Sequence, residues 1–426
     1  MSLISPEQRK AADPRHSVWV SANAGSGKTT VLTARVVRLL LAGADPARIL
    51  CVTFTKAAAA NMQNKIFEAL GAWVALDDAR LAAAIETMTG EPLRPGDLPK
   101  ARRLFARAVE TPGGLKIQTI HGFCERLLHL FPFEAGVPAR FKVLDDAEQS
   151  AITEAAITAT LNTALTDSSG SLGKALIAAT SAAGEGGFRD ALREFMRHRR
   201  EPASPLLETK FAVSPLRQKL GIKPGETAEN TEREVLTHAL YSTDWRAIRD
   251  WLRSSGKARD KDMAEALEAG SGAQGEQKLT SYVSVFLTES LQPRPDKGFF
   301  ISAELRKARN DLTETMLAER ERVHTLMQKR NAIAAVDRTE AIIALADAVN
   351  ARYRAEKRRL GRLDFPDLIG KVVTLLTEDT AKWVLYKLDQ GLDHVLVDEA
   401  QDTSPEQWAI VKAISDDFFA GEGARP

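Results

Sequence analysis

The sequence feature that most constrains the fold is a loop of small residues that ends in Gly-Lys-Thr. Residues 21–30 read Ser-Ala-Asn-Ala-Gly-Ser-Gly-Lys-Thr-Thr. The apolar, β-branched run 18–20 precedes the loop, and apolar residues with helical spacing follow it over residues 31–41. This pattern predicts a strand, a turn and a helix that begins near Lys28. A loop in that position is predicted to bind phosphate groups.

The residue types of the loop suit an anion. Gly25 and Gly27 allow backbone angles that a Cβ would resist, so N–H groups can turn inward, and the following helix adds its positive dipole end. We expect Lys28 to reach the β- and γ-phosphates of a nucleotide and the Thr29 hydroxyl to bind Mg²⁺. Alanine at position 22, where the general G-x-x-x-x-G-K-[ST] pattern has glycine, is a mild departure. The predicted loop contacts are Ala22, Asn23, Ala24, Gly25, Ser26, Gly27, Lys28, Thr29 and Thr30.

Composition indicates a globular protein. The chain has 426 residues, enough for two or three domains, and 44% of them are apolar while 27% are charged. The chain has 58 Lys and Arg and 57 Asp and Glu, which gives a net charge of +1. Any nucleic-acid surface must therefore come from local clustering of cations. We expect a cytoplasmic protein without a membrane span, since no apolar run is long enough and the N-terminus lacks a signal pattern. Cys51 and Cys124 are expected to be buried thiols.

A second strand and helix follow the loop. Residues 49–53 are apolar and β-branched, and the Ala-rich segment 57–70 has high helix propensity. Phe54, Thr55 and Lys56 therefore lie at the carboxyl end of a strand, where open α/β sheets bind ligands. A ring, a hydroxyl and a cation suit a nucleic-acid backbone or a stacked base. The alternative is that Phe54 belongs to the core.

A third strand is expected over residues 116–120. Helices broken at residues 90–92 and 95–96 precede it, and a helix over residues 125–130 follows. His121 lies at the carboxyl end of this strand. A single histidine is more often structural than functional, so both interpretations of His121 stay open.

From residue 146 to residue 362 the alternation of strands and helices stops. The segment has helical periodicity, so we expect an all-helical insertion with its longest helix near residues 305–360. Ile342, Leu345, Val349 and Tyr353 form one apolar stripe on that helix. Breaks are expected near residues 168–173, 184–187, 201–205 and 269–277.

The longest helix also carries many cations. They could line a DNA path, or they could form a solvated face of ion pairs with neighbouring glutamates. The cations are Arg320, Arg322, Lys329, Arg330, Arg352, Arg354, Lys357, Arg358 and Arg359.

An acidic pair ends the last predicted strand. Residues 394–397 are mostly apolar and lead into Asp398 and Glu399. An acid at that position can hold Mg²⁺ through water, and the next carboxylate can orient or deprotonate an attacking water. The fold class expected from the residues is thus α/β, a parallel sheet flanked by helices with a large all-helical inserted domain.

Four motifs, in order and in spacing, resemble those of superfamily 1A DNA helicases, the UvrD/Rep group. They are Ala-Gly-Ser-Gly-Lys-Thr at 24–29, Val-Thr-Phe-Thr-Lys at 52–56, Thr-Ile-His-Gly-Phe-Cys at 119–124 and Asp-Glu-Ala-Gln-Asp-Thr at 398–403. The third motif, the helical insertion and Asp-Thr-Ser-Pro-Glu-Gln-Trp at 402–408 look closest to the RecB/AddA branch, and to AddA most of all. The resemblance covers nearly the whole chain and is weakest between residues 147 and 362.

The resemblance implies roles for individual residues. Gln8 matches the glutamine that reads adenine, and Gln401 matches a glutamine that couples the γ-phosphate to DNA. Lys28, Glu399 and Gln401 would be catalytic, while Thr29 and Asp398 would hold Mg²⁺. The residues that match motifs contacting or supporting single-stranded DNA are Phe54, Thr55, Lys56 and His121.

The resemblance also implies an architecture and partners. Residues 1–145 and 363–426 would form a RecA-like P-loop NTPase domain, 1A, and residues 146–362 a helical domain, 1B. The implied cofactors are ATP and Mg²⁺. The implied partners are single-stranded DNA, duplex ends and an AddB-like subunit, in the bacterial cytoplasm at the nucleoid.

The implied function is the ATP-binding part of a DNA helicase-nuclease subunit that unwinds and processes double-strand ends for recombinational repair. The alternatives are a UvrD-like single-subunit repair helicase and a nucleotide-gated DNA-binding module without turnover. Such helicases need a second RecA-like domain with a Gly-Asp-x-x-Gln-Ser motif and an arginine finger, and AddA adds a nuclease domain. The sequence contains none of these, so we expect an N-terminal part of a longer protein that binds nucleotide weakly and does not unwind DNA alone.

Overall fold

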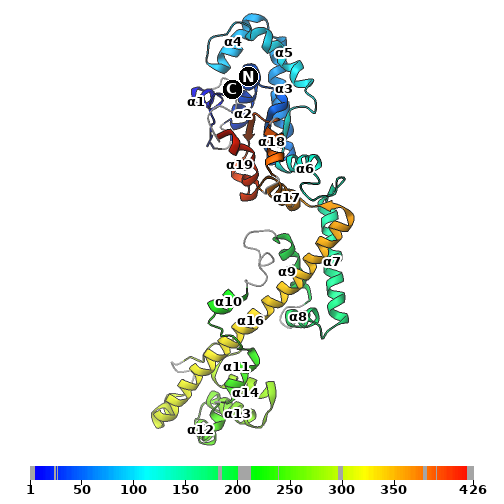
Figure 1. The fold of residues 1–426 in the computed structure, drawn as a ribbon. Coiled ribbons are helices and arrows are strands. Elements are labelled where there is room, and N and C mark those ends of the chain that lie inside the picture. Colours follow the sequence, from blue (N-terminus) through cyan, green and yellow to red (C-terminus); the bar gives the residue numbers. More distant parts are fainter. Residues whose placement is uncertain are drawn as a thin grey trace. The chain divides into compact units, whose positions relative to one another are not determined.

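The chain divides into two compact units in the computed structural model (Figure 1). Unit 1 comprises Met1–Gln149 and Lys357–Pro426, and unit 2 comprises Ser150–Glu356. The structure describes residues 5–23, 25, 27–180, 185–199, 213–237, 239–295, 301–377, 381–389 and 391–419. In these ranges no helix is long and apolar enough to cross a membrane. The assignment of residues 1–145, 146–362 and 363–426 to domains 1A and 1B stays a prediction.

A three-stranded parallel sheet is the centre of unit 1. Its order is β2-β1-β5, with β1 at Ile49–Thr53, β2 at Lys116–Thr119 and β5 at His394–Val397. The central strand β1 is buried at every position, which explains why its sequence is apolar on both faces. These strands confirm the three predicted from residues 49–53, 116–120 and 394–397.

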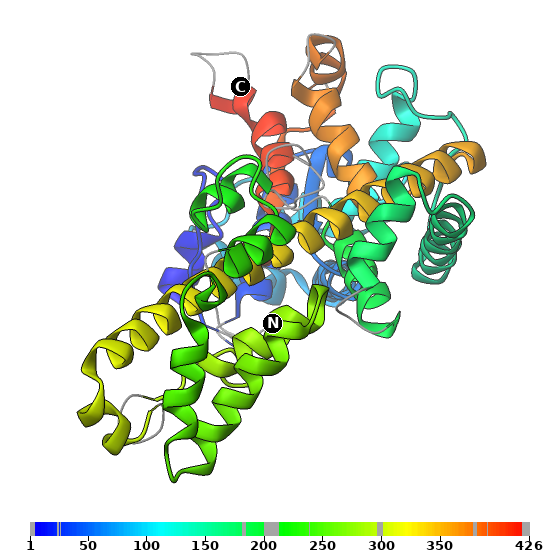
Figure 2. The same ribbon diagram turned by 90° about the horizontal axis from the view of Figure 1, so that it is seen from below.

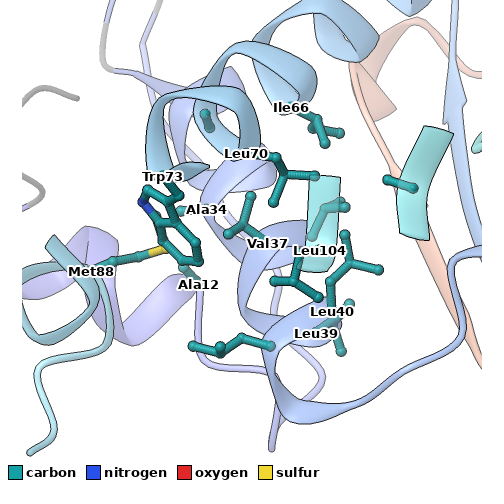
Figure 3. Close-up of a cluster of buried hydrophobic side chains, with 14 of the residues drawn as sticks. Ala12, Ala34, Val37, Leu39, Leu40, Ile66, Leu70, Trp73, Met88 and Leu104 are labelled. Carbon is teal, nitrogen blue, oxygen red and sulfur yellow. The ribbon is translucent and has the colours of Figure 1, made fainter. Parts of the chain in front are cut away.

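One face of the sheet packs against α1 to α5. Cys51 of β1, with Ile117 and Leu396 beside it on β2 and β5, points to this side. Figure 3 shows the cluster, in which Leu40, Leu70, Trp73 and Leu104 come from three different helices. The helices on this side are α1 (Pro6–Ala11), α2 (Lys28–Ala42), α3 (Lys56–Ala75), α4 (Asp78–Thr89) and α5 (Asp97–Val109), with the short turn η1 (Pro46–Arg48) before β1.

The other face packs against helices from both ends of the chain. Leu50 and Val52 of β1 lie in a second core with Cys124 of α6 and Ile410 of α19. Both cysteines are buried free thiols, as expected. The elements on this side are α6 (Ile120–Leu130), α17 (Phe365–Thr377), α18 (Ala381–Asp389), η3 (Ala400–Asp402) and α19 (Pro405–Phe419). The two-residue strands β3 (Lys142–Val143) and β4 (Arg362–Leu363) pair in parallel in the same unit.

The strand predicted at residues 18–20 is wrong. The segment has no regular secondary structure, and Val18, Trp19 and Val20 are 43%, 73% and 41% exposed. The indole of Trp19 lies 6.1 Å from that of Trp408 on α19, between ring centroids. Both edges of β1 are already occupied by β2 and β5, so the burial of the central strand does not require this three-residue run.

Helix α6 begins earlier than the predicted helix over residues 125–130. The Thr119 side chain accepts a hydrogen bond from the Gly122 N–H at 3.1 Å and so caps the helix directly at the end of β2. His121 therefore lies in the first turn of a helix. The helix predicted for residues 57–70 is confirmed and extends to Ala75.

The helices and turns of unit 2 contain no regular β-strand in its described residues. In Figure 1 the long helix α16 runs from yellow to orange, with α12, α13 and α14 near its amino-terminal half and α8 and α9 beside its carboxyl-terminal half. Figure 2 shows green helices along α16 from a second direction. Its elements are α7 (Asp146–Thr166), α8 (Ser171–Thr180), α9 (Glu185–Arg197), α10 (Val213–Lys219), α11 (Ala228–Thr237), η2 (Leu240–Ser242), α12 (Trp245–Arg253), α13 (Ala258–Gly272), α14 (Gly275–Phe286), α15 (Ala303–Ala308) and α16 (Asn310–Leu360).

Two of the predicted breaks are narrower than expected. Helix α8 already begins at Ser171, and α13 continues through Gly270 to Gly272. Gly270 serves close packing, because a Cβ there would overlap the Tyr241 hydroxyl. The break at 201–205 and the beginning of the one at 184–187 lie outside the described residues.

Three of the nine cations named above for α16 form ion pairs within the described part of unit 2. Arg322 contacts Glu319 at 2.6 Å, Lys329 contacts Glu226 at 2.6 Å and Arg330 contacts Glu232 at 2.7 Å. Arg320 is buried and donates to the Arg294 carbonyl. These contacts favour the face of ion pairs over a DNA path along this part of the helix. The apolar stripe is confirmed, since Leu345, Val349 and Tyr353 are fully buried and Ile342 packs against them.

A buried charge cluster in unit 1 fixes the start of α17. Asp364 and Asp367 accept hydrogen bonds from each other's backbone N–H groups at 2.9 and 3.2 Å, as in a capping box. The Lys357 ammonium contacts both carboxylates, at 2.6 Å for Asp364. Asp364 is 0% exposed, Lys357 4% and Asp367 9%, so the cation is held where water does not compensate the two negative charges.

Replacing Lys357 should therefore destabilise unit 1 strongly. Lys357→Met leaves the two carboxylates without this cation, and we expect a loss of about 3–5 kcal/mol in the free energy of unfolding. Urea denaturation followed by tryptophan fluorescence measures it. The matched control is Arg358→Met, an exposed neighbour on the same helix, with an expected change within about 0.5 kcal/mol. Equal effects of the two variants would contradict a structural role for the cluster.

Candidate functional site

The loop before α2 has the backbone of an anion cradle. Gly25 and Gly27 have φ values of 79° and 85°, in the left-handed region that glycine adopts without strain. Gly27 is the N-cap of α2, and no side chain caps this helix within the described chain. The first N–H groups of α2 are thus available to an anion, with the positive end of the helix dipole behind them. Ala24 and Ser26 lie outside the described residues.

Gln8 lies against this loop. It is the third residue of α1, where its Oε1 accepts a hydrogen bond from the Ser5 N–H at 3.0 Å in a capping box. A Cβ added at Gly27 would come within 2.9 Å of Gln8 Nε2. Position 27 thus needs glycine both for its backbone angle and for this close approach. The contact of Gln8 with adenine stays a prediction.

The acidic pair follows β5 directly. The Asp398 N–H donates to the Val52 carbonyl at 2.9 Å, so Asp398 continues the ladder between β5 and β1. Glu399 then takes a left-handed backbone with φ 51°, which costs a residue other than glycine on the order of 1–3 kcal/mol. Strain of this kind is often found at functional sites.

The structure brings Lys28, Glu399 and Gln401 together. Lys28 Nζ lies 3.7 Å from Glu399 Oε2, and the Gln401 side-chain amide donates to the same oxygen. The Lys28 and Glu399 side chains are 30% and 38% exposed, so the ion pair is accessible from solvent. Thr29 and Thr30 lie beside Lys28 in the first turn of α2.

Asp398 lies in an environment that favours a bound cation. Burial raises the pKa of its carboxyl group, and the neighbouring charge of Glu399 raises this pKa further, while Lys28 and Lys65 act in the opposite direction. A carboxylate whose ionised form is disfavoured by burial gains from a nearby positive charge. Perturbed acids of this kind are typical of functional sites.

The segment after β1 is exposed at the same edge of the sheet. Phe54 is 48% exposed, so the alternative that it belongs to the core is wrong. The Thr55 hydroxyl accepts a hydrogen bond from the Ala58 N–H at 3.0 Å and caps α3, and Lys56 is the exposed first residue of that helix. The contacts of these residues with DNA stay predictions.

His121 lies beside an aromatic ring that sequence reasoning missed. Its ring centroid is 4.9 Å from that of Phe365, at an interplanar angle of 62°. Burial lowers the pKa of His121, which favours the neutral imidazole at physiological pH. Phe365 is 41% exposed at the start of α17, and the signal for it was the segment Leu-Asp-Phe-Pro-Asp at 363–367. The role of His121 at DNA stays a prediction.

A small cavity of about 10 Å³ lies between the residue that follows β1 and the acid that follows β5. Phe54, Asp398, Thr403 and Gln407 are among the residues that line it. Gln407 is 8% exposed and accepts a hydrogen bond from the Ser404 N–H through its Oε1 at 3.2 Å. Gln407 was also missed, although it lies in the 402–408 motif. Phe54 and Asp398 thus line the same cavity.

Comparison with known proteins identifies the family of the chain. The UvrD/REP helicase N-terminal domain matches residues 4–420. Three relatives are each described as one of the subunits of an ATP-dependent helicase/nuclease. The protein of Lactobacillus acidophilus is 36% identical over 153 residues, which is 36% of this chain and 11% of the relative. The proteins of Leuconostoc mesenteroides and Lactiplantibacillus plantarum are 23% and 26% identical over 96% of this chain and 34% of each relative.

The chain thus spans about a third of the length of the relatives that it matches from end to end, 34% in both cases. The domain match, by contrast, extends over nearly all of the chain, from residue 4 to residue 420. It includes the loop before α2, the segment after β1, the β2–α6 junction and the acidic pair after β5. This protein belongs to the UvrD/Rep helicase family.

Proposed function

We propose that this chain is the ATP-binding part of an ATP-dependent DNA helicase, within a helicase-nuclease that unwinds and processes double-strand ends for recombinational repair. The observation that carries the proposal is the contact of Lys28 Nζ with Glu399 Oε2 at 3.7 Å, beside a glycine loop at the start of α2. The relatives described as ATP-dependent helicase/nuclease subunits support it. The proposed localisation is the bacterial cytoplasm, at the nucleoid.

The proposed fold of unit 1 is a RecA-like P-loop NTPase domain, 1A, made of residues 1–145 and 363–426. Three parallel strands with helices on both faces support it. Residues 146–362 would be the inserted helical domain 1B. An AddB-like subunit is the proposed partner in a heterodimer, in line with the word subunit in the relatives' descriptions.

The proposed nucleotide site fits ATP with Mg²⁺. The Gly25 and Gly27 backbone would hold phosphate oxygens through N–H groups, with Lys28 as their counter-charge and Gln8 beside Gly27 at the adenine. Thr29 and Asp398 would hold Mg²⁺, which would neutralise charge on the phosphates. The absence of a Cβ at Gly27 allows the close approach of the Gln8 side chain.

Glu399 is the proposed general base. Its carboxylate would be either paired with Lys28 or released from this pair. Without nucleotide, Lys28 and Glu399 neutralise each other. A phosphate that takes Lys28 as its partner separates this pair, and Glu399 is then available to accept a proton from water. Gln401, which donates to Glu399, would hold the carboxylate in position during this exchange.

The proposed DNA surface lies at the same edge. Phe54 would stack on a base, Lys56 would contact a phosphate, and Thr55 and His121 would contact or support single-stranded DNA. Phe54 and Asp398 line one small cavity, so the proposed DNA and nucleotide sites would be close enough to influence each other through its lining residues.

Lys28→Ala should weaken nucleotide binding without unfolding the chain. It removes a charge-assisted contact with phosphate from a partly exposed loop residue, so we expect a dissociation constant about tenfold higher or more. Titration of a fluorescent ATP analogue with Mg²⁺ measures this, and circular dichroism checks the fold. Lys10→Ala, an exposed lysine on α1, is the matched control and should leave binding unchanged. Unaltered binding by Lys28→Ala would refute the phosphate assignment.

Glu399→Gln and Asp398→Asn should separate two roles. The glutamine keeps shape but does not accept a proton, so we expect Mg²⁺–ATP to bind while hydrolysis falls by about 10²-fold or more. Asp398→Asn should instead reduce the dependence of nucleotide binding on Mg²⁺. Nucleotide titrations with and without Mg²⁺, together with phosphate release by the intact protein, distinguish the two variants. The division of roles fails if both variants behave alike.

Phe54→Ala and Lys56→Ala should both weaken single-stranded DNA binding, for different reasons. Loss of stacking costs about 1–3 kcal/mol, largely independent of salt, whereas loss of Lys56 should lower the salt slope by about 1. Anisotropy of a labelled oligothymidine at several salt concentrations measures both. Phe133→Ala is the aromatic control, since Phe133 is 87% exposed elsewhere in unit 1. Equal losses from the two phenylalanine variants would exclude this surface.

A further inference from the structure

A pocket of about 170 Å³ lies in unit 1 away from the site described above. Its walls come from β2, α6, α18 and the segment before β5. Lys116 is the first residue of β2, and Leu392 precedes β5 by two residues. Phe54 and Asp398 follow the carboxyl ends of their strands. Because the strands are parallel and Lys116 pairs with Leu50, the pocket begins at the amino-terminal ends of the strands, and Lys116 lies about 13 Å from Phe54 along the strand direction.

A buried donor in this pocket lacks an acceptor. Gln118 points to the same face of β2 as Lys116, two residues before it, and both line the pocket. Gln118 Nε2 is buried and has no hydrogen-bond partner among the described residues. Buried amide nitrogens are nearly always paired in native proteins, so an orphan donor in a pocket wall indicates an acceptor that comes from a ligand.

The charges around the pocket are all positive among its described lining residues. They are Lys116, Arg126 on α6 and Lys387 on α18. The Lys116 ammonium donates to the Gly391 carbonyl at 3.0 Å, and burial together with the charge of Arg126 lowers its pKa. Arg126 and Lys387 are exposed at the rim, and neither forms an ion pair in the described part of the chain. This cluster therefore favours an anionic ligand.

The floor of the pocket is apolar. Phe123, Leu127 and Leu392 are buried there, while Leu130 at the end of α6 is 64% exposed. On α18, the Trp383 ring is 51% exposed and lies under the Lys387 ammonium, with Nζ 4.8 Å from the ring centroid. A bare phosphate would leave these surfaces in water, whereas an apolar side chain would cover them.

We propose that this pocket docks an acidic peptide segment of a partner protein. One apolar side chain of the segment, of about leucine size, fills the space over Leu127 and Leu392. Its carboxylates pair with Arg126 and Lys387, and a carbonyl or carboxylate oxygen accepts the hydrogen bond of Gln118. A nucleic-acid ligand is disfavoured because it offers anions without an aliphatic anchor. The docking site is independent of the proposed nucleotide site.

The test measures binding of a labelled peptide, acetyl-Asp-Glu-Leu-Phe-Asp-Glu-amide, to the 426-residue chain by fluorescence anisotropy. Two further probes isolate the chemistry: the same peptide with Ser-Ser in place of Leu-Phe, and a hexathymidylate of comparable charge. We expect saturable binding of the first peptide and at least about tenfold weaker binding of the other two probes at the pocket.

Charge reversal identifies the surface. Arg126→Glu with Lys387→Glu should weaken the peptide by about tenfold or more. The matched control, Lys100→Glu with Arg103→Glu on exposed positions of α5, should change it less than about twofold. Gln118→Leu should weaken the peptide severalfold while the thermal midpoint of unfolding stays equal or rises, since the orphan donor is gone. If the double charge reversal disturbs the fold, Arg126→Gln replaces it as the test variant.

Three results would overturn the proposal. The first is the absence of saturable peptide binding. The second is equal loss from the α5 control and the pocket variant, which would indicate attraction to the overall charge only. The third is hexathymidylate binding that matches the peptide and falls with Arg126 and Lys387, which would identify a nucleic-acid surface instead.

Discussion

The pairing of β1 with two parallel neighbours is the constraint on which the rest of unit 1 depends. Every residue of β1 is buried, so its backbone groups must be satisfied by β2 on one side and β5 on the other. Parallel pairing then places the ends of all three strands at one edge. Phe54, His121 and Asp398 reach that edge for this reason, although hundreds of residues separate the last of them from the others along the chain.

The short elements at this edge are held by capping contacts. Thr55 and Thr119 each close a strand and start a helix within one or two residues, so Lys56 and His121 lie in first helical turns with little freedom. Asp364 likewise caps α17, together with Asp367. This cap fixes the position of Phe365 beside His121. By contrast, no side chain of the described residues caps α2, so the first N–H groups of this helix are open to a ligand.

Local patterns predicted most of unit 1, and tertiary contacts account for what they missed. The strands at 49–53, 116–119 and 394–397 were predictable because each is a short segment with β-branched residues, bounded by a helix or turn signal. Residues 18–20 have a similar local pattern but pair with no strand in the described part of the chain, so the pattern was insufficient. Gly270 was predicted to lie in a break between helices. Its close approach to Tyr241 in the structure reveals a packing role instead. Gln118 likewise has no sequence signal, since its isolation depends on neighbours from α6 and α18.

The contact of Trp19 with Trp408 has a practical consequence. Trp19 lies two residues before the glycine-containing loop, while Trp408 lies on α19, which follows the acidic pair by a few residues. The two indoles therefore lie on the two chain segments that the proposed phosphate site would join. Because their centroids are 6.1 Å apart and Trp19 is 73% exposed, a small displacement alters both their mutual quenching and their hydration. Trp19 and Trp408, two of the six tryptophans of the chain, therefore offer a fluorescence signal for ligand binding at the proposed site without an added dye.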